Sequence, residues 1–214
     1  MPWFYYVTVV LLKAFFLLFT RCHVNGRDNI PGSGPVLIVA NHLSNTDPPL
    51  LGVCLLRAVK FMAKSELFRK PFFAYILYGY GAFPVRRGQL DRQALRLSYQ
   101  SLTDGSTLVM FPEGTRSLDA KLQPALPGPA LIAMRSGVPL LPIGITGTEK
   151  IKGLAWLLRR PKIVVNIGRP FYLPQTDGHV SKEGLAEAVT VMMCHIAELL
   201  PPEYRGVYGE EVSL

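Results

Sequence analysis

A histidine and an aspartate lie five positions apart in the polar segment "VANHLSNTDPP", residues 39 to 49. A neutral imidazole can take a proton from an attacking hydroxyl group. A carboxylate on its other nitrogen fixes the tautomer and stabilises the imidazolium. His42 and Asp47 are therefore candidates for a catalytic pair, in which His42 is the general base and Asp47 orients it.

The same two residues also have a purely structural interpretation. Asp47 precedes Pro48 and Pro49, and an aspartate followed by proline is a common start of a helix, so Asp47 is also expected as an N-cap. A loop histidine can make a local hydrogen bond without any chemistry. The spacing alone leaves both interpretations open, and the two roles are compatible because a carboxylate has two oxygens.

A second polar segment, "FPEGTRS" at residues 111 to 117, also follows an apolar run. Gly114 lets the backbone approach a ligand, Thr115 offers a hydroxyl, and Arg116 offers a planar guanidinium suited to phosphate. These types of residue favour an anion-binding loop. A turn closed by a salt bridge between Glu113 and Arg116 is the structural alternative.

Short apolar runs alternate with longer amphipathic stretches along the chain. Strands are expected at 36 to 40, 59 to 63, 82 to 85, 106 to 111, 139 to 145 and 163 to 168. Helices are expected at about 48 to 56, 68 to 81, 91 to 102, 128 to 136 and 182 to 200, and a short connector follows residue 20. This alternation predicts a single α/β domain with a mostly parallel central sheet flanked by helices, in which ligands bind where strands end.

The first twenty residues are apolar except for Lys13 and two threonines. They lack the basic start and the cleavage site of a signal peptide. As a helix, residues 3 to 19 would be about 26 Å long, against roughly 30 Å of bilayer hydrocarbon. We expect residues 1–20 to form a membrane anchor helix, as a short span or within one leaflet, ahead of a catalytic domain at 21–214. A helix packed against that domain is the alternative.

The formal net charge of +8 predicts an anionic partner. Basic residues around Trp156 suit an anionic membrane surface or an acidic carrier protein. The oily N-terminus and the lack of an aromatic and basic recognition motif argue against nucleic acid. The chain has three cysteines, which lie far apart in apolar runs and are expected to be free thiols: Cys22, Cys54 and Cys194.

Four segments, "NHLSNTD", "GAFPVRR", "FPEGTRS" and "VPLLPIGI", resemble in this order the four sequence blocks of the glycerolipid acyltransferases. This is the 1-acyl-sn-glycerol-3-phosphate O-acyltransferase family, also called the lysophosphatidic acid acyltransferases, and the resemblance runs from about Val24 to Pro174. It implies the family's α/β fold and transfer of a fatty acyl group to lysophosphatidic acid, giving phosphatidic acid. The donor would be acyl-CoA or acyl-acyl-carrier-protein, with no cofactor or metal, at the cytoplasmic face of the cell membrane.

The resemblance also assigns roles to residues. His42 would deprotonate the acceptor hydroxyl, Asp47 would orient His42, and transfer would be direct, without a covalent enzyme intermediate. The residues expected to bind substrate, mostly through its phosphate, are Lys64, Arg87, Glu113, Gly114, Thr115 and Arg116. Two alternatives stay open: another lysophospholipid or glycerol phosphate as the acceptor, and an ester hydrolase in which His42 activates water or Ser44.

Overall fold

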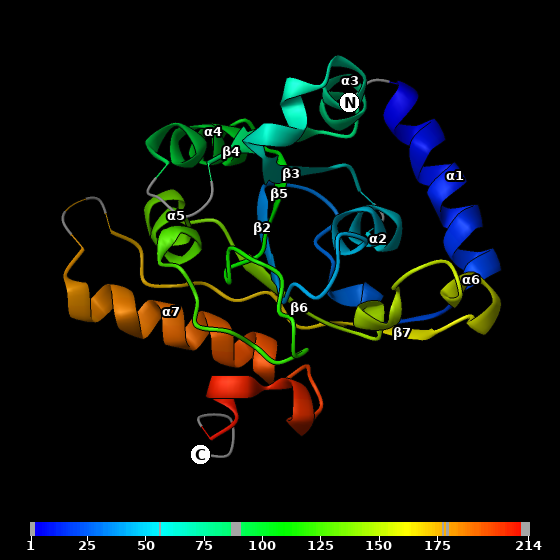
Figure 1. The fold of residues 1–214 in the computed structure, drawn as a ribbon. Helices are drawn as coiled ribbons and strands as arrows, with labels where there is room; N and C mark the ends of the chain where they lie inside the picture. Colours follow the sequence, from blue (N-terminus) through cyan, green and yellow to red (C-terminus); the bar gives the residue numbers. More distant parts are fainter. Residues whose placement is uncertain (1–2, 56, 87–90, 177, 179, 211–214) are drawn as a thin grey trace.

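Seven strands form the central sheet of this protein: β1 (Arg21–Asn25), β2 (Val36–Ala40), β3 (Val59–Lys64), β4 (Ala82–Val85), β5 (Thr107–Met110), β6 (Leu140–Thr146) and β7 (Lys162–Ile167). Their order across the sheet is β1-β7-β6-β2-β5-β3-β4 (Figure 1). All neighbouring strands are parallel except β6 and β7, which are antiparallel. The computed structural model describes residues 3–55, 57–86, 91–176, 178 and 180–210.

The predicted mostly parallel sheet is confirmed, and each of the six expected strands begins and ends within one residue of its expected bounds. These strands could be predicted from the sequence because a parallel sheet is covered on both faces. Its strands are therefore continuous apolar runs. All five residues of β2 are buried, for example. From the same alternation of strands and helices, we also expected helices to cover both faces of this sheet.

The helices are α1 (Trp3–Phe19), α2 (Asp47–Cys54), α3 (Pro71–Gly79), α4 (Arg92–Thr103), α5 (Gly128–Ser136), α6 (Trp156–Arg159) and α7 (Lys182–Ala197). Figure 1 shows the sheet between two helical layers, with α1 and α2 on one face and α4, α5 and α7 on the other. The expected helices are present. The last one ends at Ala197 rather than at residue 200, and the short α6 lies in a segment for which no element was expected.

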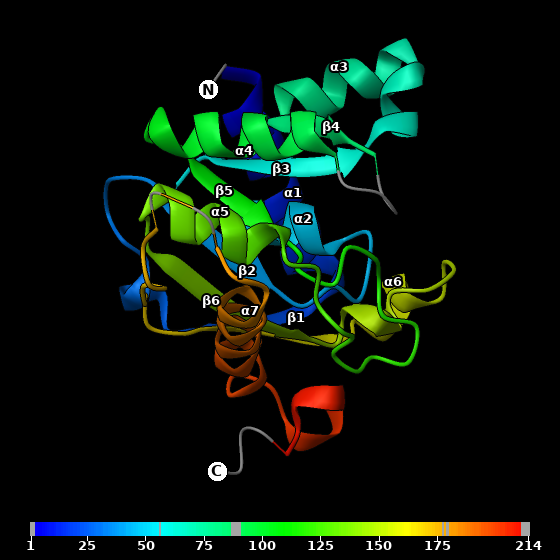
Figure 2. The ribbon, with the colours of Figure 1, turned by 90° about the vertical axis from the view of Figure 1, so that its left-hand side faces the viewer.

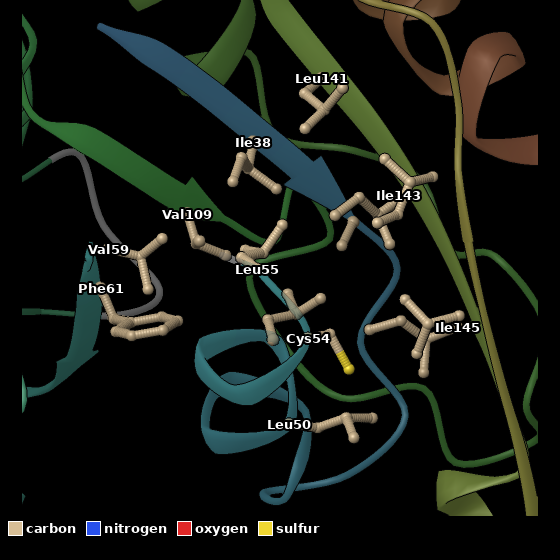
Figure 3. Packing of buried hydrophobic residues seen from close by; sticks show 14 of the residues in the cluster. Ile38, Leu50, Cys54, Leu55, Val59, Phe61, Val109, Leu141, Ile143 and Ile145 are labelled. Carbon is tan, nitrogen blue, oxygen red and sulfur yellow. The ribbon is translucent and has the colours of Figure 1, made fainter. Parts of the chain in front are cut away.

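Successive residues of β2 contribute to two different hydrophobic cores, because side chains of a strand alternate between the faces of its sheet. Ile38 packs in the core that includes Leu50 and Cys54 of α2 (Figure 3). Leu37 and Val39 pack in the core with α4, α5 and α7. Each helical layer thus has its own apolar core, and β2 is held firmly from both sides.

The segment Arg21–Asn25 is a strand, and not the connector expected from the sequence. It pairs in parallel with β7 at the edge of the sheet, and its residues are exposed or half-buried in alternation. An edge strand of this kind has no continuous apolar run, so the pattern gave little signal. In the structure Cys22 is half-buried and packs against the core that includes the buried Cys54 of α2.

Helix α1 packs one side against the domain and leaves an apolar side exposed. Tyr5 and Phe16 are buried in the core beside α2, and the Tyr5 hydroxyl accepts a hydrogen bond of 3.2 Å from the backbone N–H of Val59. The exposed apolar side chains of the helix, called here the α1 face, are Tyr6, Val7, Val10, Leu11, Phe15, Leu17 and Leu18. Among the helices in the described part of the chain, none combines the length and hydropathy needed to cross a bilayer.

Candidate active site

The carboxyl ends of β2 and β5 meet at one edge of the sheet and place the two polar segments next to each other. The strands are neighbours, with Val39 paired to Met110, so the loops that follow them leave the sheet side by side. His42 lies in the loop after β2, and Asp47 is the first residue of α2. The Nδ1 atom of His42 lies 2.9 Å from Oδ2 of Asp47, and the two residues are 3% and 0% exposed.

Asp47 is not the N-cap of α2. The N-cap is Thr46, and the Asp47 carboxylate turns back towards the preceding loop. Its Oδ2 atom accepts hydrogen bonds from the backbone N–H groups of Leu43 and Ser44, both at 2.7 Å, as well as from His42. The position in the first turn of a helix favours the negative charge of this carboxylate.

This arrangement leaves one nitrogen of His42 available for proton transfer. Because the charged carboxylate faces Nδ1, it favours the tautomer that carries a proton there and has an unprotonated Nε2. Within the described residues Nε2 has no hydrogen-bond partner, and His42 lines a cavity. The pair therefore has the geometry of a general base and its orienting carboxylate.

Three further contacts fix the position of His42. Its backbone N–H donates to Oε1 of Glu113 at 2.8 Å, and its carbonyl accepts from the backbone N–H of Ser117 at 2.8 Å. Its ring stacks on Phe111, with the ring centroids 4.2 Å apart and the planes at 23°. The second polar segment, residues 111–117, thus holds the histidine of the first one in place.

Asn41, immediately before His42, is a positioning residue to which the sequence interpretation gave no role. Its side-chain amide donates to the carbonyl of Ile145 at 2.8 Å, and its carbonyl oxygen accepts from the N–H of Ile145 at 2.7 Å. Asn41 thereby continues the pairing of β2 with β6 through its side chain. The sequence shows only an asparagine directly after an apolar strand. The residue that Asn41 contacts, Ile145, lies 104 positions away and could not be inferred from the local pattern.

Glu113 was expected in the phosphate pocket, but its contacts give it another role. Its Oε1 atom accepts from the backbone of His42 and its Oε2 atom from the backbone N–H of Gln123, at 2.8 and 3.0 Å. The side chain is 6% exposed, and this burial raises the pKa of Glu113 to about 7. A carboxyl group in this position joins two loops, so these contacts make Glu113 a positioning residue for His42. Direct contact of Glu113 with the phosphate stays a prediction.

The shifted pKa of Glu113 gives a prediction for stability. A raised carboxyl pKa means that the folded state binds the proton more tightly than the unfolded state. The contribution of the protonated Glu113 carboxyl to the free energy of unfolding is therefore fully present below about pH 4.5. It is lost as the pH rises through about 7, by up to about 3 kcal/mol. The measurement is urea unfolding of the protein and of Glu113→Gln between these pH values. The difference between the two free energies of unfolding should change with pH, and a constant difference would contradict the shift.

A cavity of about 530 Å³ lies beside His42. Its polar wall includes Arg86, Asp91, Glu113, Gly114 and Thr115. Gly114 has φ +69°, and a Cβ at this position would lie 2.6 Å from Cδ1 of Leu126, so a side chain here would be strained and would fill the cavity wall. The rest of the wall is mainly apolar: Met62, Val85, Ala94, Leu95, Val109, Met110, Phe111 and Leu126.

Of the other expected phosphate ligands in the described residues, neither Arg116 nor Lys64 lines this cavity. Arg116 is exposed on the loop that follows Gly114 and Thr115. Lys64, the last residue of β3, is not among the residues that line the cavity, and its Nζ lies 3.4 Å from Oε1 of Glu66. Arg87 lies outside the described residues, although its neighbour Arg86 lines the cavity.

Comparison with known proteins adds an independent observation. A family model described as "Acyltransferase" matches residues 21–146, which include both polar segments. A chloroplastic 1-acyl-sn-glycerol-3-phosphate acyltransferase of Brassica napus is 32% identical over 166 residues, which are 74% of this chain and 47% of the relative. A protein of the same name from Bacillus subtilis is 29% identical over 88% of this chain and 92% of its own length. The chain spans about half the length of several of the curated relatives it matches.

A solved structure shows the same fold. The crystal structure of the 1-acyl-sn-glycerophosphate acyltransferase from Thermotoga maritima superposes with a TM-score of 0.66 at 31% sequence identity. The match covers 85% of this chain and 74% of that one. Because the family model spans more than half of the residues and the fold agrees as well, this chain belongs to the acyltransferase family.

Proposed function

We propose that this protein transfers a fatty acyl group from an acyl thioester to the free hydroxyl of lysophosphatidic acid, giving phosphatidic acid. The observation that carries the proposal is the buried pair of His42 and Asp47, 2.9 Å apart, beside a largely apolar cavity. The printed names of the relatives from Brassica napus, Bacillus subtilis and Thermotoga maritima support the acceptor.

The proposed reaction needs one base and no nucleophile from the protein. Nε2 of His42 takes the proton of the acceptor hydroxyl as its oxygen attacks the thioester carbonyl, while Asp47 stabilises the imidazolium. The thiol then leaves with the proton that the imidazolium returns. Because the substrate supplies the nucleophile, both substrates only have to be held together at His42, and no covalent enzyme intermediate is formed.

We assign the acceptor's phosphate to the part of the cavity wall formed by Arg86, Gly114 and Thr115. Arg116 and Arg87 are the proposed ligands, with backbone access at Gly114 and a hydroxyl from Thr115. Arg86 adds positive charge, since it lines the cavity itself. Lys64 is paired with Glu66, so its contribution is restricted to the general positive field at this edge.

The hydrolase alternative finds less support in the contacts of Ser44. Its hydroxyl oxygen accepts hydrogen bonds from the N–H and the hydroxyl of Thr46, and Ser44 is not among the residues that line the cavity. A water nucleophile would release free fatty acid instead of a diacyl product.

The test is an assay of the purified protein with each acceptor and donor in turn. The acceptors are lysophosphatidic acid, lysophosphatidylcholine and glycerol 3-phosphate, each against a coenzyme A and an acyl-carrier-protein thioester. The proposal expects phosphatidic acid from lysophosphatidic acid as the fastest product. Faster acylation of another acceptor, or release of fatty acid in place of acyl transfer, would refute it.

We further propose that the protein binds an anionic membrane surface at the cytoplasmic face of the cell membrane, with α1 lying in one leaflet. The α1 face is supported by neighbouring exposed apolar side chains on α3 and around α6, among them Phe72, Tyr75, Leu154 and Leu158. These helices follow one another around one side of the molecule (Figure 1). Exposed cations beside them suit acidic headgroups: Lys150, Lys152, Arg159 and Arg160. A lipid surface, and not nucleic acid, is the partner that such an apolar face fits.

Charges placed on the α1 face should release the protein from lipid. In Leu11→Glu with Leu18→Glu, two side chains that are 65% and 63% exposed become acidic without disturbing the core. We expect sedimentation with phosphatidylglycerol vesicles to fall at least about tenfold, because burying a charge costs more than about 1.4 kcal/mol. The matched control is Tyr172→Glu with Val207→Glu, which are 68% and 61% exposed and lie elsewhere. Equal sedimentation of both double variants would contradict binding through α1.

A further inference from the structure

A second cavity is lined mainly by residues of α4 and α5. Its volume is about 760 Å³. Three arginines line it: Arg92 and Arg96 from α4 and Arg135 from α5. The apolar part of its wall comes from Leu95, Tyr99, Leu131 and Ile132. Thr176 and Gly178 complete the wall of this arginine groove, and Asp177 between them lies outside the described residues. The described residues that line the groove include no Asp or Glu.

The three arginines have no anionic partner within the described part of the chain. None of them makes an ion pair or a side-chain hydrogen bond there. Asp91, which precedes Arg92, uses its oxygens on the backbone N–H groups of Arg86, Gln93 and Ala94. Arg92 and Arg96 are four residues apart on one helix, where like charges repel each other. Three arginines that line one groove favour a ligand that carries more than one negative charge.

The arginine groove adjoins the cavity that contains His42. Leu95 lines both. The amino ends of α4 and α5 form part of the catalytic cavity through Ala94 and Gly128, and a Cβ on Gly128 would lie 3.5 Å from Leu95. Leu95 therefore forms part of the boundary between the arginine groove and the cavity that contains His42.

The groove and the α1 face lie on opposite faces of the sheet. The buried residues of α1 belong to the core that includes α2, whereas α4 and α5 belong to the core that includes α7. Figure 2 shows α4 and α5 in front of the sheet and α1 behind it. The arginines of the groove therefore lie on the face of the sheet that is turned away from a membrane bound by the α1 face.

We propose that the arginine groove binds the nucleotide part of a coenzyme A thioester. The inference rests on the proposed acyl transfer, for which it selects coenzyme A as the carrier of the donor. The nucleotide's phosphates lie on Arg92, Arg96 and Arg135, the adenine ring packs on Tyr99 and the apolar wall, and the thiol arm passes Leu95 towards His42. A concave site of about 760 Å³ lies in the range of about 300–1,000 Å³ typical of small-molecule sites, whereas a carrier protein would need a broad surface.

Binding of adenosine 3′,5′-bisphosphate to the detergent-solubilised full chain, measured by calorimetry, tests the site without relying on activity. We expect saturable binding that Arg96→Ala and Arg135→Ala each weaken by roughly tenfold to a hundredfold, since each removes a charged hydrogen-bonding group. The control Arg169→Ala, an exposed arginine outside the groove, should bind as the parent protein does. With an acyl-CoA donor, the groove variants should raise KM for the donor and leave KM for lysophosphatidic acid unchanged.

Several outcomes would overturn the assignment. The first is that the protein is active with acyl-CoA but does not bind the bisphosphate. The second is that the groove variants bind the bisphosphate as the parent protein does. The third is that the groove variants slow acyl transfer only from acyl-carrier-protein. The last result would make the groove a docking site for an acidic protein. If the bisphosphate binds as expected but no donor and acceptor pair gives a product, the proposed acyl transfer fails while the nucleotide site stands.

Discussion

Replacing Asp47 with asparagine is expected to lower the rate of acyl transfer by roughly 10²- to 10⁴-fold while the protein stays folded. The reason lies in the unequal use of its two oxygens. Oδ2 accepts three hydrogen bonds, whereas Oδ1 is buried and has no partner within the described residues. An asparagine oxygen can replace Oδ2 and keep all three donors, with the NH₂ group at the place of Oδ1. The variant thus removes the charge that stabilises the His42 imidazolium and little of the structure.

The backbone contacts of this carboxylate also predict how the asparagine amide is oriented. The N–H groups of Leu43 and Ser44 both point at Oδ2, so an NH₂ group placed there would meet donors only. The oxygen is therefore favoured beside His42, which keeps the same tautomer. The measurement is kcat of the variant together with its thermal unfolding, and Asp104→Asn, an exposed carboxylate at the end of α4, is the control. A normal kcat together with a lowered melting temperature would show that Asp47 has a structural role only.

The sheet and the contact between His42 and Asp47 were predictable from the sequence for physical reasons. Strands buried on both faces are short apolar runs, and the polar break after such a run marks the end of a strand, where parallel sheets bind ligands. The two segments of this kind, residues 41–47 and 112–117, do lie side by side. The edge strand β1 and the reversed direction of β7 against β6 were not predictable, because neither changes the local hydrophobic pattern.

The residues that hold the pair in place were harder to predict. Glu113 contacts the backbone of His42 across 71 positions of sequence, and Asn41 contacts Ile145 across 104. Glu113 and Asn41 bind backbone groups, so no complementary partner side chain can be identified in the sequence. The segment at residues 111–117 therefore placed Glu113 near the site without indicating which groups it contacts. The arginine groove was hard to predict for a similar reason: its charges come together only when α4 packs on α5.

His42→Ala removes the proposed base and tests the mechanism at its centre. His42 is 3% exposed and stacks on Phe111, so its loss leaves a small cavity. The variant should still fold, because the backbone bonds of residue 42 to Glu113 and Ser117 do not depend on the imidazole. His42→Gln, which fills more of the space, guards against a variant that fails to fold. The matched control is His23→Ala, which removes an exposed imidazole of β1.

The decisive measurement is the initial rate of phosphatidic acid formation from lysophosphatidic acid and an acyl thioester. It is made with the parent protein, His42→Ala and His23→Ala after circular dichroism has shown that all three are folded. We expect His42→Ala to retain less than about a thousandth of the parent rate, because base catalysis and its orientation are both lost. We expect the rate of His23→Ala to be unchanged. A folded His42→Ala protein that forms phosphatidic acid within about tenfold of the parent rate would contradict the role of His42 as the base.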